Sequence, residues 1–307
     1  MLRFIIRRLI LTIPLILVVI SITWGLIRLA PGNFYSGEKR LPPGIEKNIR
    51  EKYGLDKPWH VQYGKMIWNI VRHGDFGTSL KYEGQSVNKI IARSLPVSAT
   101  IGILAYLLAL IIGVTVGSIA ALKQNSRSDY ASMTVAMLGI SVPNFVLGPL
   151  LVLIFSLTLY WLPPSRWNGF PSWNLILPVI TLSAIYMAYI ARLTRAGMLE
   201  VLRSDYIRTA RSKGLSEKDV LLRHALRGGL MPVISYTGPA LAFLLTGTVV
   251  VERLFVLPGL GNYFIQASLN RDEPLLIGIV AFVAITLLLM NLLVDIAYAY
   301  LDPRVRY

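Results

Sequence analysis

The residues that most often perform catalysis are sparse in this 307-residue chain and are not grouped. Cysteine is absent, which excludes disulfides, thiolate metal sites and a cysteine nucleophile. The three histidines, His60, His73 and His224, have no partner at the i,i+4 spacing of helical zinc motifs. No serine lies in a G-x-S-x-G nucleophile motif. The sequence therefore predicts no catalytic residue and no metal site, and the chain is not expected to be an enzyme.

The phosphate-binding motif G-x-x-x-x-G-K-[ST], which cradles ATP, is absent as well. We therefore expect no cofactor on this chain, and any ATP that drives its work must be bound by another chain. The formal net charge of +15 suits an anionic membrane surface or nucleic acid. Because no nucleic-acid module accompanies that charge, nucleic acid is not an expected partner.

One polar segment, residues 205–229, interrupts the apolar sequence and gathers basic side chains around Gly214. Ser204 or the next residue is suited to cap a short helix before this glycine, and Ser216 with Asp219 matches a capping box for a second helix. Each helix has an apolar side but is too short to cross a membrane. The pattern predicts a glycine elbow that docks in a groove on a partner protein. The alternative is an amphipathic segment that rests on anionic lipid.

Asp295 is the strongest single candidate for a functional residue, because it lies in an otherwise apolar stretch near the C-terminal end. A carboxylate at the centre of a membrane helix costs about 2.5–3.5 kcal/mol on insertion scales, so such residues are functional candidates. Two interpretations are open. The favoured one is structural anchoring, since Asp295 is close enough to the end of the span to reach water or a basic partner, and the other is proton coupling.

The segment 205–229 and Asp295 must be positioned by long apolar helices. Hydrophobic residues make up 54% of the chain and charged residues 15%, against about 45–50% and 25% in soluble proteins. Each stretch without Asp, Glu, Lys or Arg is long enough to cross a hydrocarbon core. The stretches cover residues 9–27, 94–122, 130–165, 167–191, 228–251 and 274–294. They predict an all-α polytopic membrane protein with six transmembrane helices.

Helix breakers interrupt several of these stretches. Residues 130–165 are too long for one straight span, and Pro143 with Asn144 predicts a kink or an end. The pair Gly238 and Pro239 predicts another break, and broken helices in transporters tend to line a path. Polar, uncharged residues near the breaks form our candidate translocation path: Ser141, Asn144, Ser235, Tyr236 and Thr237.

Small residues recur at every fourth position in the second span, at Ala109, Gly113, Gly117 and Ala121. Such a seam lets helix backbones approach closely in lipid. We favour packing within this chain over an interface with another subunit.

The basic residues of the short loops lie mostly on the side that carries both termini, which predicts cytoplasmic termini. The long first loop is also basic, but long loops translocate largely regardless of charge. We therefore divide the chain into four parts. These are the first transmembrane helix (1–29), an extracytoplasmic segment with short helices (30–93), a five-helix core that includes the coupling segment 203–227 (94–301), and a cytoplasmic tail (302–307).

Two outer segments show helical patterns. In the first, Ile45 pairs with Ile49, and Val61 lies on one face with Ile67. The second, residues 262–269, follows a Pro/Gly turn. We expect both to form short helices at the outer surface of the membrane.

Several motifs together resemble one family. "YIRTARSKG" followed by "LLRHAL" is similar to the coupling motif of ABC importer permeases, in the version of the oligopeptide, dipeptide and nickel branch. "RLAPG", "GDFGTS", "AALKQN", "SVPNF", "LPGLG" and "LDPRVRY" extend the resemblance along the chain, most closely to B-type permease subunits of bacterial oligopeptide importers. Arg208 and Thr209 stand where the broader permease pattern has Glu and Ala, but Gly214 is kept.

The resemblance implies a type I ABC importer permease in the bacterial inner membrane. It implies a homologous C-type permease partner, two cytoplasmic ATPases that bind ATP and Mg²⁺, and an extracytoplasmic peptide-binding protein. It also implies which residues couple the chain to the ATPases: Tyr206, Ile207, Arg208, Thr209, Ala210, Gly214, Leu215, Val220, Leu221 and His224.

Other functions stay open at this point. Within the same class, the cargo could be dipeptides, glutathione or nickel instead of oligopeptides. From other classes, a proton-coupled carrier would depend on Asp295, and a structural assembly subunit would transport nothing.

Overall fold

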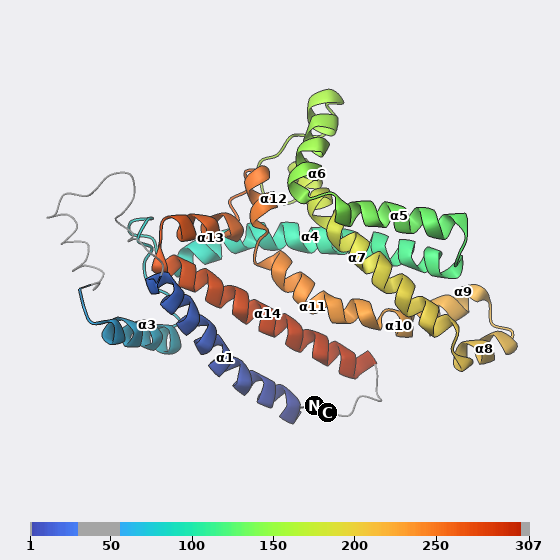
Figure 1. Ribbon diagram of the computed structural model, residues 1–307, viewed down its shortest axis with the longest axis horizontal. Helices are drawn as coiled ribbons and strands as arrows, with labels where there is room; N and C mark the ends of the chain where they lie inside the picture. Colours follow the sequence, from blue (N-terminus) through green and yellow to red (C-terminus); the bar gives the residue numbers. More distant parts are fainter. Residues whose placement is uncertain (1, 30–55, 302–307) are drawn as a thin grey trace.

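The computed structural model describes residues 2–29 and 56–301, and these residues fold into helices with one isolated bridge between Thr78 and Ser86 (Figure 1). The α-helices are α1 (Leu2–Leu29), α3 (Trp59–His73), α4 (Val87–Leu122), α5 (Arg127–Ser141), α6 (Asn144–Leu151), α7 (Ile176–Leu202), α8 (Asp205–Ser212), α9 (Glu217–Asp219), α10 (Leu226–Gly229), α11 (Met231–Leu245), α12 (Val249–Leu254), α13 (Leu260–Leu269) and α14 (Glu273–Leu301). Shorter elements are the π-helices η1 (Val152–Thr158) and η3 (Val220–Ala225) and the 3₁₀ turn η2 (Trp173–Leu175). The expected helix around Ile45 and the expected tail 302–307 lie outside the described residues.

Five of these helices are long and apolar enough to cross a membrane, and a sixth crossing results if α5 and the helical stretch after it count as one bent span. The two parts of that span meet at 103°. Pro143 has no backbone N–H, and Val142 before it is extended, with ψ of 112°, so the helix must end there. The break predicted at Pro143 is confirmed, whereas the break predicted at Gly238 and Pro239 is wrong, because α11 continues from Met231 to Leu245 with Pro239 inside the helix. The six predicted spans correspond to α1, α4, the bent pair, α7, α11 and α14.

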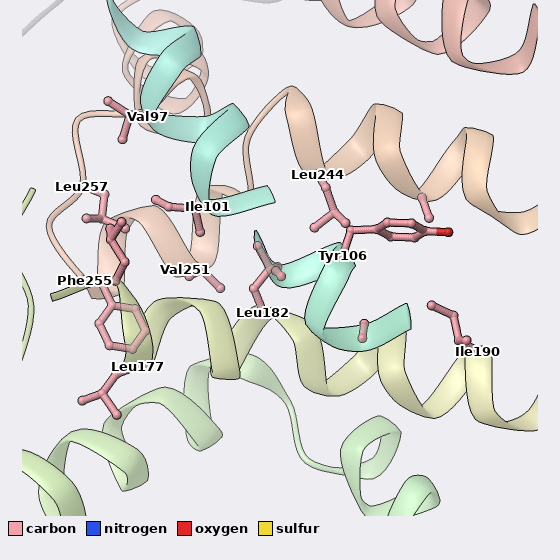
Figure 2. Packing of buried hydrophobic residues seen from close by; sticks show 14 of the residues in the cluster. Val97, Ile101, Tyr106, Leu177, Leu182, Ile190, Leu244, Val251, Phe255 and Leu257 are labelled. Carbon is pink, nitrogen blue, oxygen red and sulfur yellow. The ribbon is translucent and has the colours of Figure 1, made fainter. Parts of the chain in front are cut away.

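The core of the molecule is the contact between α4 and α7, which cross near its centre (Figure 1). A Cβ on Gly113 would lie 2.8 Å from the Ile190 side chain, and one on Gly117 would lie 2.4 Å from the Ala191 carbonyl oxygen. Glycine is therefore required at both positions for this approach. The small-residue seam packs within the chain, as we favoured. Figure 2 shows Ile101 and Tyr106 of α4 beside Leu182 of α7 in the same cluster.

Buried carboxylates fix the ends of several helices. Asp129 of α5 is 1% exposed and accepts two hydrogen bonds from the Arg195 guanidinium of α7, both 2.7 Å. Asp272, before α14, is fully buried and accepts hydrogen bonds from the backbone N–H groups of Leu80 at 3.0 Å and Lys81 at 3.2 Å. These bonds hold the loop that precedes α4 against the start of α14.

A third buried carboxylate, Glu252 of α12, organises the loop from Gly247 to Asn262. It is 2% exposed and accepts hydrogen bonds from Ser98 Oγ at 2.7 Å and from the Asn262 backbone N–H at 3.1 Å. A Cβ on Gly259 would lie 2.3 Å from Glu252 Cδ, so a larger residue there would displace the carboxylate from its hydrogen bonds. We call residues 247–262 the outer loop. The helix predicted over 262–269 is confirmed as part of α13.

Following the predicted orientation, we call the end with α3 and α13 the outer end, and the end with α8 and α9 the inner end (Figure 1). At the outer end, α3 packs on α1, where the rings of Trp24 and Tyr63 lie 5.2 Å apart. The short helix predicted around Val61 is therefore present.

Candidate functional site: the elbow between α7 and α11

The predicted elbow forms at the inner end, where the chain leaves α7 and returns into α11 (Figure 1). Helix α8 ends next to Gly214, which has φ of +78°. An L-residue with a Cβ rarely adopts this left-handed conformation, whereas glycine adopts it readily. No atom lies within 4 Å of the place where a Cβ would stand. The requirement for glycine is therefore set by the backbone and not by crowding.

The second limb starts as the sequence predicted and then runs on toward α11. Ser216 occupies the N-cap and its Oγ accepts a hydrogen bond from the Asp219 backbone N–H at 3.2 Å, which confirms the capping position. At the first limb, Ser204 holds the N-cap position but its hydroxyl donates to the Val201 carbonyl at 2.6 Å, so the expected side-chain cap is absent there. Beyond α9 the chain stays helical through η3 and α10, with Leu230 as the short link to α11.

The apolar sides of both limbs are buried against the core helices. Ile207 and Val220 are 0% exposed, and they cluster with Ala121 at the end of α4 and Met198 of α7. At about 25 cal/mol per Å² of apolar area, this burial fixes the elbow to the spans. The elbow therefore moves with α4 and α7 and does not hang from them as a loose loop.

Backbone contacts tighten the same junction. A Cβ on Gly197 of α7 would lie 2.2 Å from the Gly229 carbonyl oxygen of α10, and one on Gly229 would lie 2.5 Å from Met198 Sδ. Helices α7 and α10 thus touch backbone to backbone. A displacement of the second limb must be passed directly to α7.

The opposite side of the elbow faces outward with both apolar and charged groups. Tyr206 is 49% exposed, Leu215 is 39% exposed and Leu222 is 52% exposed. Arg211 of the first limb donates to both carboxylate oxygens of Glu217 of the second limb, at 2.8 and 3.2 Å. This fork-to-fork pair bridges the glycine turn. Exposed apolar side chains among charges are typical of a protein-binding surface.

The structure divides the predicted coupling residues by exposure. Ile207, Ala210 and Val220 are buried inside the chain. Leu221 and His224 are half-buried, and Tyr206, Arg208, Thr209, Gly214 and Leu215 are exposed. Only the exposed members are open to a partner in this conformation. The predicted set of coupling residues leaves out Arg211, Glu217 and Leu222, although opposite charges on the two sides of a turn glycine were a usable signal for the first two.

The five predicted path residues fall into two groups. Ser141 and Asn144 lie at the break between α5 and α6, whereas Ser235, Tyr236 and Thr237 lie on α11. Helix α5 packs on α7 around Ala188 and Ala191, while the Tyr236 ring meets α7 through two tyrosines. The structure therefore does not bring the two groups into one cluster.

Tyr236 of the group on α11 belongs to a tyrosine cluster, and the sequence reasoning missed the other two members, Tyr186 and Tyr189. The Tyr236 ring lies 6.4 Å from Tyr186 and 5.8 Å from Tyr189. The Arg192 guanidinium lies 5.1 Å from the Tyr189 ring, within cation–π range. Tyrosines at i and i+3 of a membrane helix, followed by an arginine, were the available signal.

Asp295 forms an ion pair with Arg8 of α1, and its side chain is 20% exposed. A carboxylate that is held by a guanidinium from a neighbouring helix favours the anchoring interpretation over proton coupling. Within residues 2–29 and 56–301, no group of three or more His, Asp or Glu side chains is arranged to hold a metal ion.

Comparisons with known proteins agree on one class. Residues 113–307 match the family described as "Binding-protein-dependent transport system inner membrane component", and residues 1–102 match the N-terminal family of the same membrane components. The chain is 48% identical to the oligopeptide transport system permease protein OppB of Salmonella typhimurium and 47% identical to that of Escherichia coli K12, over 100% of both chains. It is 41% identical to the dipeptide transport system permease protein DppB of Bacillus subtilis, over 100% of this chain and 98% of that protein.

A solved structure shares the fold. Inward-facing MetNI, a methionine ABC transporter, superposes with a TM-score of 0.59 at 14% identity, over 70% of this chain and 97% of that chain. At this level of identity the likeness concerns the fold alone.

Proposed function

Because the chain belongs to the family of binding-protein-dependent transport system inner membrane components, we propose that it forms the membrane passage for oligopeptides in an ATP-driven importer. It is a permease subunit of a peptide ABC importer and not an enzyme. The identity of 47–48% over the whole length of two oligopeptide permeases is the observation that carries this proposal. Helices α1, α4, the bent pair, α7, α11 and α14 would supply the six crossings of a multi-pass bacterial inner-membrane protein.

The assembly that this function needs includes other chains. We propose a homologous C-type permease as the second membrane subunit, two cytoplasmic ATPases that bind ATP and Mg²⁺, and an extracytoplasmic peptide-binding protein. Both termini would then face the cytoplasm. This chain would bind no nucleotide itself.

The elbow is the proposed contact with one ATPase. Its exposed Tyr206, Leu215 and Leu222 would enter a groove on that subunit, while its buried Ile207 and Val220 hold it to the spans. Because α10 touches α7 backbone to backbone, movement of the ATPase would turn α7 as a rigid body. Rigid rotation of the spans is what alternation between outward and inward openings requires.

The proposed path runs along α11, where Ser235, Tyr236 and Thr237 offer polar groups without fixed charge and Tyr186 and Tyr189 extend the aromatic part of the wall. Ser141 and Asn144 lie apart from this group, at the break between α5 and α6, and would not line the same wall. A wall of this kind tolerates varied peptide side chains, with affinity supplied by the separate binding protein. Replacing Ser235 with Asp should lower uptake of acidic peptides more than uptake of basic ones.

The decisive experiment measures uptake by the chain reconstituted in proteoliposomes with the proposed C-type permease, the two ATPases and the peptide-binding protein. ATP-dependent uptake of labelled tri- to pentapeptides is the expected result. Uptake of dipeptides or Ni²⁺ alone would overturn the oligopeptide assignment but keep the permease.

A proton-coupled carrier is the alternative from another class. It requires that Asp295→Asn stop uptake and that a proton gradient replace ATP. The ion pair of Asp295 with Arg8 argues for loss of stability in that variant, with uptake per assembled transporter kept and still dependent on ATP.

A further inference from the structure

Two ion pairs join α1 to α14, one near each end of α1. At the outer end, Arg28 Nη2 lies 2.9 Å from Glu273 Oε2, and at the inner end Arg8 pairs with Asp295. With a rise of 1.5 Å per residue, Arg8 and Arg28 are roughly 30 Å apart along the helix. This matches the thickness of a hydrocarbon core, about 30 Å. A bilayer with its boundaries at these two pairs would enclose the apolar part of α1 between them.

Between these pairs the contact of α1 with α14 is uneven. In the outer half, Ile20 is 1% exposed and packs against Ile277 and Ala281. In the inner half the helices draw apart toward their free ends (Figure 1), and a groove of about 270 Å³ opens between them. The groove is lined by Arg7, Arg8, Leu11, Thr12, Leu15 and Leu288.

The lining separates by chemistry along the membrane normal. Leu11 and Leu15 are 57% and 48% exposed and line the part that lies within the hydrocarbon layer. Arg7 and Arg8 lie at the mouth, and Asp295 beside them carries a single negative charge, so the mouth keeps a net positive charge. The apolar groove is complementary in shape to an acyl chain, and its cationic mouth is complementary in charge to the phosphate above that chain.

We propose that this groove binds one anionic glycerophospholipid of the leaflet at the inner end. Its phosphate is held at Arg7 and Arg8, and one acyl chain lies against Leu11, Leu15 and Leu288. Guanidinium groups bind phosphate oxygens in a bidentate manner, and basic pockets between membrane helices select anionic head groups. The stretch from Arg8 to Leu15 is roughly 10 Å along the helix, which is the upper part of an acyl chain. The lipid completes the α1–α14 contact that protein side chains leave open, and the proposal holds whatever cargo the permease carries.

The test uses the chain with the subunits that co-purify with it, in nanodiscs of phosphatidylcholine with increasing phosphatidylglycerol. Bound lipid is counted by native mass spectrometry. Wild type should retain phosphatidylglycerol in preference to phosphatidylcholine, and Arg7→Gln should lower that retention about fivefold, the effect of one basic residue near an anionic surface. Arg127→Gln, an exposed arginine outside the groove, is the charge-matched control and should change nothing. Arg8 is left intact because its removal would strand Asp295.

A second pair of variants tests the acyl part of the groove without a change of charge. Leu11→Trp should fill the groove and displace phosphatidylglycerol, whereas Ile13→Trp, at a 60% exposed position that does not line the groove, should leave it bound. Equal retention of both lipids, an equal loss in Arg127→Gln, or full retention in Leu11→Trp would overturn the proposal. Displacement of the lipid by excess glycerol 3-phosphate would also overturn it, since it would show a free-phosphate site.

Discussion

The elbow and the outer loop lie at opposite ends of α11, and they are held in different ways. The outer loop is built around a buried carboxylate, Glu252, that accepts hydrogen bonds from Ser98 and from the backbone at Asn262. The elbow is held by apolar packing of Ile207 and Val220, and its ion pairs are exposed. The buried network fixes one geometry, because a change in it leaves polar groups without partners in a dry site. Apolar packing with exposed charges leaves the elbow able to adapt its outer side to a partner.

The largest expected effect comes from Glu252→Ala, which removes the acceptor at the centre of the outer loop. The Ser98 hydroxyl and the Asn262 N–H would each lose a partner, at a cost of about 1–3 kcal/mol per group. We expect a strong fall in the melting temperature of the purified assembly, with the elbow still protected in hydrogen exchange. Glu252→Gln, which keeps one acceptor oxygen, is the control and should lose less. A melting temperature equal to that of wild type would show that the outer loop does not depend on this carboxylate.

Gly259→Ala should come next, because its Cβ would stand 2.3 Å from Glu252 Cδ. Overpacking of this kind costs about 1–3 kcal/mol. The cost should shrink when Glu252 is also alanine, since the smaller side chain leaves room for the new methyl group. A double-mutant cycle on thermal unfolding measures this coupling, and simple additivity of the two changes would contradict the contact.

A smaller loss of stability, with a large loss of uptake, is expected for Gly214→Val. The left-handed conformation at φ of +78° costs an L-residue about 1–2 kcal/mol, and β-branching adds to it. Membrane insertion should be kept while ATP-dependent uptake and its ATPase coupling are lost. Gly214→Asn, which tolerates this conformation, should keep most of the uptake. If Asn and Val are equally inactive, the partner itself must need the space beside Gly214.

The smallest effect should come from Arg211→Ala, because the pair with Glu217 is exposed. Exposed ion pairs contribute about 0–1 kcal/mol. We expect the melting temperature to shift by little, and any fall in uptake should be modest and largest at low salt, where the pair is least screened. Charge reversal at both positions restores the pair and serves as the control. A severe loss in Arg211→Ala that the reversed pair does not rescue would place Arg211 in direct contact with the partner.

Much of the fold could be predicted because the bilayer imposes it. Helix length, the break before Pro143 and the capping position of Ser216 each follow from local chemistry that the sequence displays. The seam at Gly113 and Gly117 was visible as a period of four, and only its partner, α7, needed the structure.

The missed features depend on contacts between distant segments. Glu252 sits at the end of an apolar stretch, where a carboxylate is common, and its burial depends on Ser98 and on glycines that follow it in the chain. The tyrosine cluster forms only because α7 and α11 pack together. Leu222 is exposed because the packing of Val220 turns the opposite side of the second limb outward. Spacing along the chain does not determine any of these contacts.

The backbone contact between α4 and α7 at Gly117 has a consequence for how force travels through the bilayer. Where the backbones of α4 and α7 touch, no flexible side chain lies between them to absorb a displacement. A tilt of one helix must therefore be passed to the other. A methyl group added at Gly117 would stand 2.4 Å from the Ala191 carbonyl oxygen and would push the two helices apart. Transport should then fail because α4 and α7 no longer move as one unit.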